Sequence, residues 1–100
     1  MSLARISGER IANTGNVTLY TGAGRLSGVL ISNDNAAVQD VIFYDSLTVI
    51  LTIHVHPALA PIYISFTEAG GKLEGIPFTT ALIANKGHAD VELNVWYLEY

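Results

Sequence analysis

The chain has 100 residues and a net charge of −4; 50% of its residues are hydrophobic and only 14% are charged, against about 25% in a typical soluble domain. This composition excludes an intrinsically disordered chain, and the absence of cysteine excludes a disulfide framework and a cysteine-based zinc site. The five basic residues are scattered, so we expect no nucleic-acid partner, because phosphate contacts need clustered Lys and Arg.

Turn-forming residues recur roughly every 8–12 residues, a spacing typical of β-sandwiches and barrels. We therefore predict one all-β domain over residues 1–100. Its expected architecture is an antiparallel two-sheet β-sandwich of about eight short strands, with the jelly roll as one form of it. In chain order, the predicted strands are Leu3–Ile11, Val17–Thr21, Arg25–Ser32, Val38–Tyr44, Leu47–His56, Ile62–Glu68, Phe78–Asn85 and His88–Tyr100.

The sequence leaves an alternative open for the first strand, which is an extended N-terminal arm over residues 1–12. This segment carries Arg5, Glu9 and Arg10 and lacks the apolar stretch of a secretion signal. The run Leu47–Ile64 is long enough to cross a membrane, but His and Pro interrupt it and its alternation is that of strands. We therefore expect no membrane partner and folding in the cytoplasm of the producing cell.

Two predicted strands are apolar on both faces. The side chains concerned are Val38, Val41, Ile42, Phe43 and Tyr44 in one strand, and Val91, Leu93, Val95, Trp96, Tyr97, Leu98 and Tyr100 in the other. A solvated antiparallel strand has one polar face, and a sandwich has one interior. The second apolar face therefore predicts a cover, which we expect to be another subunit.

The stretch TVILTIHVHPALAP, residues 48–61, carries two histidines on one face of a predicted strand. His54 and His56 are close enough to share a metal ion, but a metal site needs further ligands, and His88 belongs to a separate predicted hairpin around Asn85–Gly87. We expect outward or subunit-facing positions for the pair and no bound metal or cofactor; His54 and His56 are the candidates should a metal bind.

No nucleophile and base stand in a recognisable catalytic arrangement, and Gly22–Gly24 lacks the following helix of a phosphate-binding loop. We therefore predict a protein without enzymatic activity. The aromatic residues offer another reading, in which side chains such as Tyr63 and Trp96 form a platform for a sugar. In a sandwich such side chains more often fill the core or an interface.

Three segments carry a resemblance. They are GAGRLSGVLIS (residues 22–32), VQDVIFYDS (residues 38–46) and GIPFTTALIANKGHADVELNVWYLEY (residues 75–100). They resemble a group of small β-rich virion proteins of tailed bacteriophages, most of all capsid decoration (cement) proteins. Those chains often have glycine where this one has Ala81.

The resemblance implies a virion structural protein that forms a homotrimer and bridges subunits of the major capsid protein to stabilise the head. The alternative is a tail, neck or spike component that binds a glycan or a receptor. For the implied contacts we select the N-terminal segment, the PALAP loop at Pro57–Pro61 and the aromatic C-terminal end. The candidate interface residues are Leu3, Ile6, Ile11, Pro57, Leu59, Pro61, Trp96, Leu98 and Tyr100.

Overall fold

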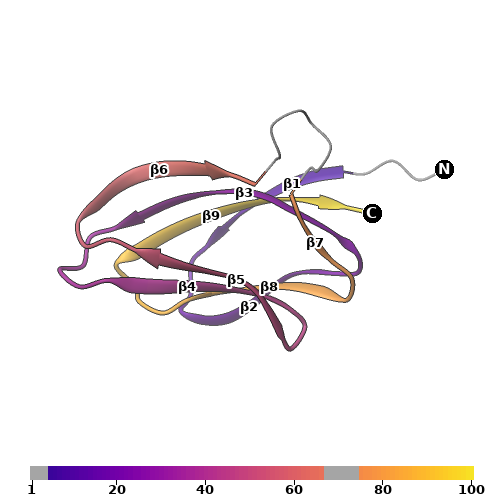
Figure 1. The fold of residues 1–100 in the computed structure, drawn as a ribbon, viewed down its shortest axis with the longest axis horizontal. Helices are drawn as coiled ribbons and strands as arrows, with labels where there is room; N and C mark the ends of the chain where they lie inside the picture. Colours follow the sequence, from indigo (N-terminus) through magenta and orange to yellow (C-terminus); the bar gives the residue numbers. More distant parts are fainter. Residues whose placement is uncertain (1–4, 67–74) are drawn as a thin grey trace.

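The computed structural model describes residues 5–66 and 75–100, and only the backbone of residues 5 and 6. Within these ranges the chain forms nine strands and no helix (Figure 1). The strands are β1 (Arg5–Ile11), β2 (Gly15–Thr21), β3 (Gly24–Asn33), β4 (Gln39–Asp45), β5 (Thr48–Val55), β6 (Leu59–Ser65), β7 (Ile76–Phe78), β8 (Ala81–Lys86) and β9 (Val91–Glu99). The described part of the chain therefore contains no helix long and apolar enough to cross a membrane.

The strands form two antiparallel sheets. Sheet A has the order β1-β9-β3-β6, with β7 also paired to β3, and sheet B has the order β2-β8-β4-β5. Figure 1 shows the two layers, with β1, β3, β6 and β9 in one and β2, β4, β5 and β8 in the other. The predicted all-β, two-sheet sandwich is confirmed.

The pairing of the strands is nested. The pair β4–β5 is enclosed along the chain by β3–β6, then by β2–β8, and finally by β1–β9. The chain is thus one long hairpin rolled up into two sheets, which is the topology of a jelly roll. Because of this rolling, the first strand, β1, lies at one edge of sheet A and pairs with the last strand, β9, which lies inside the sheet. It also leaves β5 and β6, which flank the last turn of the roll, at the edges of their sheets.

The N-terminal segment is a sheet strand where the structure describes it. Residues Arg5–Ile11 pair with β9 along their whole length, from Arg5 opposite Glu99 to Ile11 opposite Leu93. The alternative of an extended arm is therefore wrong for this part of residues 1–12. Residues 1–4 lie outside the described ranges.

Two predicted connections are wrong. The predicted strand Phe78–Asn85 is two strands, β7 and β8, which belong to different sheets. The predicted hairpin at Asn85–Gly87 is not a hairpin, because β8 continues to Lys86 and the chain then crosses to β9 in the other sheet. Gly87 also lacks the positive φ that such a hairpin requires. Strand period alone does not reveal which sheet a strand joins.

The PALAP turn is shorter than predicted. Ala58 adopts a φ of 52°, and β6 begins at the next residue, Leu59, so that Pro61 lies inside the strand. Proline has no N–H to donate and is tolerated in strands at a sheet edge. Because β6 is an edge strand, Pro61 does not interrupt the interior hydrogen bonding of sheet A.

The core lies between the sheets and is built by alternation. Val91, Leu93, Val95 and Tyr97 of β9 point inward, and every second residue of the neighbouring strands joins them. The remaining fully buried apolar side chains of this core include Ile11, Leu26, Val29, Ile31, Val41, Phe43, Val55, Phe78, Leu82 and Ala84. None of these side chains is available for contact with a partner.

A β-bulge interrupts the alternation along β5. The register between β4 and β5 shifts after Phe43, so that Leu51 pairs with Phe43 while Val49 pairs with Tyr44. The extra residue, Ile50, packs against the core. Strict alternation would place Val49 on the same face as Leu51, but Val49 is exposed because the bulge reverses the alternation.

One end of the sandwich is organised by a buried asparagine. Asn33 is fully buried at the end of β3, and its Nδ2 donates to the carbonyl oxygens of Ala37, Val55 and His56 at 3.0–3.3 Å. Its Oδ1 accepts from the N–H of Asn35 at 2.9 Å. One side chain thereby satisfies backbone groups in both the β3–β4 and the β5–β6 connections.

A buried lysine closes the crossing between the sheets. Lys86 is buried at the end of β8, and its Nζ donates to the carbonyl oxygen of Val91 at 3.0 Å. Buried lysines are rare unless they have a partner. This contact joins the last residue of β8 in sheet B to the first residue of β9 in sheet A.

Replacing Asn33 by alanine should lower the free energy of unfolding by about 2–4 kcal/mol, because several buried backbone groups lose their partner at once. Urea denaturation measures this change. Asn16→Ala is the matched control, since Asn16 accepts a hydrogen bond from Asn85 Nδ2 at an exposed position. It should cost less than about 0.5 kcal/mol. Equal effects of the two substitutions would contradict the role given to Asn33.

Candidate functional site

The outward face of sheet A is defined by the strand register. Paired residues of adjacent antiparallel strands point to the same side, and Val29, Ile64 and Val95 point to the core. Their neighbours along the strands therefore point outward in two rows that cross β1, β9, β3 and β6. The first row contains Gly8, Trp96, Gly28 and Ser65, and the second contains Arg10, Asn94, Leu30 and Tyr63.

Two glycines let aromatic rings lie on this face. A Cβ atom on Gly8 would be 2.7 Å from Trp96 Nε1, and one on Gly28 would be 2.5 Å from Tyr63 Oη. The indole therefore lies over β1, and the phenol of β6 lies over β3. The rings of Tyr63 and Trp96 meet edge to face, with centroids 5.8 Å apart and an interplanar angle of 72°. We call these two rings and the two glycines beneath them the aromatic platform.

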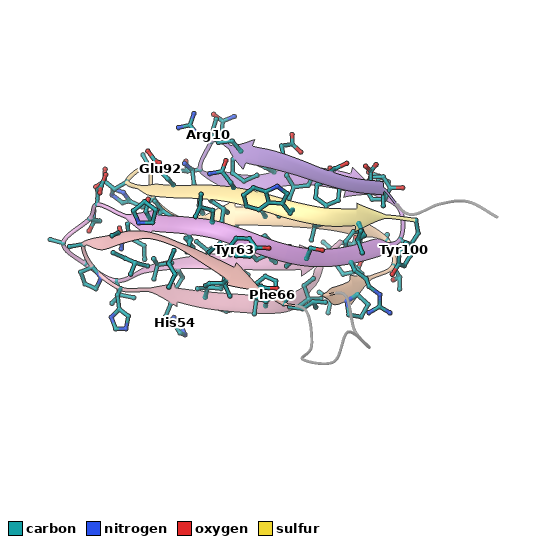
Figure 2. All side chains as sticks on the ribbon, turned by 90° about the horizontal axis from the view of Figure 1, so that it is seen from above. Arg10, His54, Tyr63, Phe66, Glu92 and Tyr100 are labelled. Carbon is teal, nitrogen blue, oxygen red and sulfur yellow. The ribbon has the colours of Figure 1, made fainter. Side chains whose placement is uncertain are left out.

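The platform is accessible and has a polar rim. Tyr63 is 55% exposed, and Trp96 is half-buried. Figure 2 looks onto sheet A and shows Tyr63 near the middle of the face, Arg10 along the β1 edge and Glu92 toward one end. Asn94 lies on β9 between Glu92 and Trp96 and points to the same side.

A shallow, open depression adjoins this face where β6 begins. It is lined by Ser32, Asp34, Glu92 and residues 58–61 of the PALAP segment. Ser32 and Glu92 are paired across β3 and β9, two residues beyond the row of Asn94 and Leu30. The depression and the platform are thus continuous along the outward face of sheet A.

The two candidate metal-binding histidines are on the other sheet, His54 in β5 and His56 directly after it. His54 Nδ1 lies 2.6 Å from Asp40 Oδ1, across the β4–β5 pair on the outward face of sheet B, and both side chains are largely exposed. His56 follows β5, and its carbonyl oxygen accepts a hydrogen bond from Asn33. Within residues 5–66 and 75–100, no three His, Asp or Glu side chains are grouped to hold a metal ion. The arrangement provides one surface hydrogen bond.

A third surface lies along β5 and β6. Among the described residues, no strand pairs with the outer edge of either one. Several of their inward-pointing side chains are only partly covered, and Ile62 is 47% exposed. The apolar residues concerned are Leu51, Ile53, Ile62, Ile64 and Phe66, and we call this surface the open side. Neither β5 nor β6 contains Lys, Arg, Asp or Glu, whereas β1 at the opposite edge of sheet A has three charged residues.

The predicted interface residues fall in different environments. Ile11 is 1% exposed and belongs to the core, so its selection as an interface residue is wrong. Leu98 is likewise buried by its own chain, opposite Ile6 and Arg25 in sheet A. Leu3 and the side chain of Ile6 lie outside what the structure describes. Sequence alternation identifies an apolar residue but not how far neighbouring strands cover it.

The other predicted interface residues are at the surface. Pro57 and Pro61 are exposed and Leu59 is half-buried, and all three lie where the chain enters β6. Trp96 belongs to the aromatic platform. Tyr100 is exposed beyond β9, where its Oη accepts a hydrogen bond from Arg25 Nε at 2.5 Å. The structure therefore brings the PALAP segment to the open side and places Trp96 on a separate face.

Sequence reasoning missed Gly8 and Gly28 of the platform and Asn94 of its polar rim. A glycine inside a strand signals a bulge or a close approach by another group, and this signal is present in both β1 and β3. The partner of each glycine is set by strand pairing, however, which links residues as far apart as Gly8 and Trp96.

Asp45, also missed, joins the end of β4 to the turn before β8. It ends β4 after Tyr44 and accepts hydrogen bonds from the N–H groups of Thr79, Thr80 and Ala81 and from Thr79 Oγ1. These bonds, led by the one from the Thr79 N–H, lower the pKa of Asp45 below its ordinary value of 3.8. The carboxylate thus fixes the turn between β7 and β8, and Ala81 serves there as the first residue of β8.

Comparison of the chain with models of known protein families, with curated proteins and with solved structures finds no match. The strand order, the aromatic platform and the open side are therefore the observations available for assigning a function.

The Asp45 contacts predict an acid-dependent loss of stability. Because the pKa is lower in the folded chain than in the unfolded one, the contribution is fully present above about pH 4 and is lost as the pH falls through the folded-state pKa. Asp45→Asn should therefore have a lower midpoint of thermal unfolding than the wild type at pH 7. The difference should shrink as the pH approaches 2. A difference that is constant between pH 7 and pH 2 would contradict the assignment.

Proposed function

We propose that the chain is a non-enzymatic structural subunit of a tailed-phage virion, and specifically a capsid decoration protein. In this role it forms a homotrimer and bridges neighbouring subunits of the major capsid protein. The resemblance in residues 22–32, 38–46 and 75–100 supports the virion assignment. Jelly rolls serve as viral capsid domains, lectin domains and cupins, so the fold alone does not distinguish these functions.

The open side is the observation that carries the proposal. Edge strands that remain single are usually protected by charged side chains, because unpaired N–H and C=O groups attract other strands. β5 and β6 have no such charges, and apolar side chains such as Ile62 lie partly exposed between them. A surface that is apolar and also offers backbone hydrogen-bonding groups is suited to permanent contact with another subunit.

Burial of this surface supplies the energy that a decoration protein needs. At about 25 cal/mol per Å² of apolar area, burying several hundred Å² per contact contributes several kcal/mol before the entropy of association is subtracted. A trimer presents several copies of each contact to a symmetric shell, and linked contacts raise the overall affinity far above that of one contact. Weak single contacts are thereby converted into stable attachment to a head.

The exposed prolines give the open side a defined contact point. Pro57 and Pro61 flank the tight turn at Ala58 and lie where β5 passes into β6. Proline restricts the backbone before binding, so ordering this segment at an interface costs less entropy. We assign the PALAP segment to the contact with the major capsid protein and the β5–β6 edges to contacts between copies of this chain.

The copy number of this chain in the virion distinguishes a head protein from a tail or neck component. A decoration protein occurs in hundreds of copies, on the scale of the major capsid protein, whereas a tail or neck component occurs in a handful. Quantitative mass spectrometry of purified virions should give the higher number. Absence of the chain from the virion would contradict the virion assignment.

Ile62→Lys should convert the trimer into a monomer of 10.7 kDa, because it places a charge on the open side where the partner would bury it. Size-exclusion chromatography with light scattering measures the mass, and thermal unfolding confirms that the variant is folded. Leu47→Lys is the matched control, since Leu47 is 95% exposed in the turn between β4 and β5. The control should remain a trimer. A wild-type chain that stays monomeric at millimolar concentration would refute the assembly.

A further inference from the structure

We propose that the aromatic platform, with its polar rim of Arg10, Asn94 and Glu92, is a binding site for neutral oligosaccharides built of hexopyranose units. This inference goes beyond the proposed structural role, because it concerns a face of sheet A that the assembly through β5 and β6 does not require. It follows from three properties of the face, which are its pair of aromatic rings, the mixed charge of its rim and its length.

The two rings meet at 72°, so a ligand that stacks on the face of one ring also meets the other ring. Side chains on Gly8 and Gly28 would displace the rings, and their absence lets the indole approach β1 and the phenol approach β3. An aromatic face carries negative electrostatic potential, which suits the weakly positive C–H groups on the apolar face of a pyranose ring. The edge-to-face contact between Tyr63 and Trp96 fixes both rings before a ligand arrives, so that little side-chain entropy is lost on binding.

The rim provides hydrogen-bonding groups of both kinds. Arg10 is a donor, Glu92 is an acceptor and Asn94 is both. Neither Arg10 nor Glu92 has a hydrogen bond or ion pair from its side chain to another residue in the described part of the chain. A neutral sugar hydroxyl both donates and accepts, so it matches a rim of mixed charge, whereas a polyanion would be repelled by Glu92. Charge complementarity therefore selects a neutral polyhydroxylated ligand.

The dimensions of the face indicate a chain of sugars rather than one. Glu92 and Trp96 are four residues apart on β9, which at about 3.3 Å per residue is about 13 Å. A ligand that stacks on the indole and reaches Glu92 extends beyond one ring.

The fluorescence of Trp96 reports on binding at the platform, because Trp96 is the only tryptophan in the chain. The purified full-length protein is titrated with cellohexaose, laminarihexaose and maltohexaose while the tryptophan emission is recorded. At least one of these probes should give a saturable change with a Kd of about 1 mM or tighter. If none of the three produces a saturable change, the proposal is wrong.

Substitutions test whether the Tyr63 and Trp96 rings bind a ligand or only cover the glycines beneath them. Tyr63→Ala should weaken binding at least about tenfold, and Gly8→Ala should do the same by displacing the Trp96 ring. Trp96→Ala, followed by isothermal titration calorimetry, should abolish binding. Tyr44→Ala is the matched control, since Tyr44 is a half-buried aromatic residue on the outward face of sheet B, and it should bind as the wild type does.

Unchanged affinity in folded Tyr63→Ala and Trp96→Ala proteins would overturn the proposal, and circular dichroism establishes that each variant is folded. Ile62→Lys should retain the wild-type affinity, because Ile62 points to the core side of β6 and Tyr63 to the outward side. Failure of sugar binding therefore leaves the proposed assembly intact, and failure of assembly leaves the sugar site intact.

Discussion

A sandwich of two sheets has a single interior, and this chain carries more apolar side chains than that interior covers. The inward residues of β9, from Val91 to Tyr97, fill the core, while Trp96 lies on the opposite face of the same strand. The rolled hairpin also leaves β5 and β6 at the sheet edges, where Ile62 is only partly covered. The apolar side chains that the interior does not cover are therefore concentrated on two surfaces, the open side and the aromatic platform. Both proposals of function derive from these side chains.

The frame that holds these surfaces is rigid because polar side chains fix the connections between strands. Asn33 satisfies backbone groups of two loops at one end of the sandwich, and Lys86 ties the end of β8 to the start of β9. Asp45 holds the turn that begins β8. Each contact joins residues from different strands, so the sheets keep their relative position. A surface that must match a partner repeatedly around a symmetric assembly benefits from such preorganisation.

Much of the fold was predictable from the sequence because strand alternation is a local property. The inward set in β9 and the two-sided character of β4 follow directly from the order of residues. The sheet to which each strand belongs was not predictable, since it depends on contacts distant in sequence, and the crossing after Lys86 was mistaken for a hairpin. The platform was predicted only as a set of aromatic residues. The meeting of Trp96 with Tyr63 depends on β3 pairing with both β9 and β6, and the bulge that exposes Val49 depends on the match between β4 and β5.

Amide hydrogen exchange along β6 tests most directly whether the open side is a contact between copies of the chain. The strand is compared at high and at low protein concentration, with β1 as an internal reference because it is the charged edge of the same sheet. If the free edge of β6 is paired with another subunit, the β6 amides that point away from β3 are protected from exchange at high concentration. They exchange faster on dilution, while the exchange of the β1 amides does not change. Equal exchange of the β6 amides at both concentrations, with the outward amides unprotected throughout, would show that this edge meets only solvent.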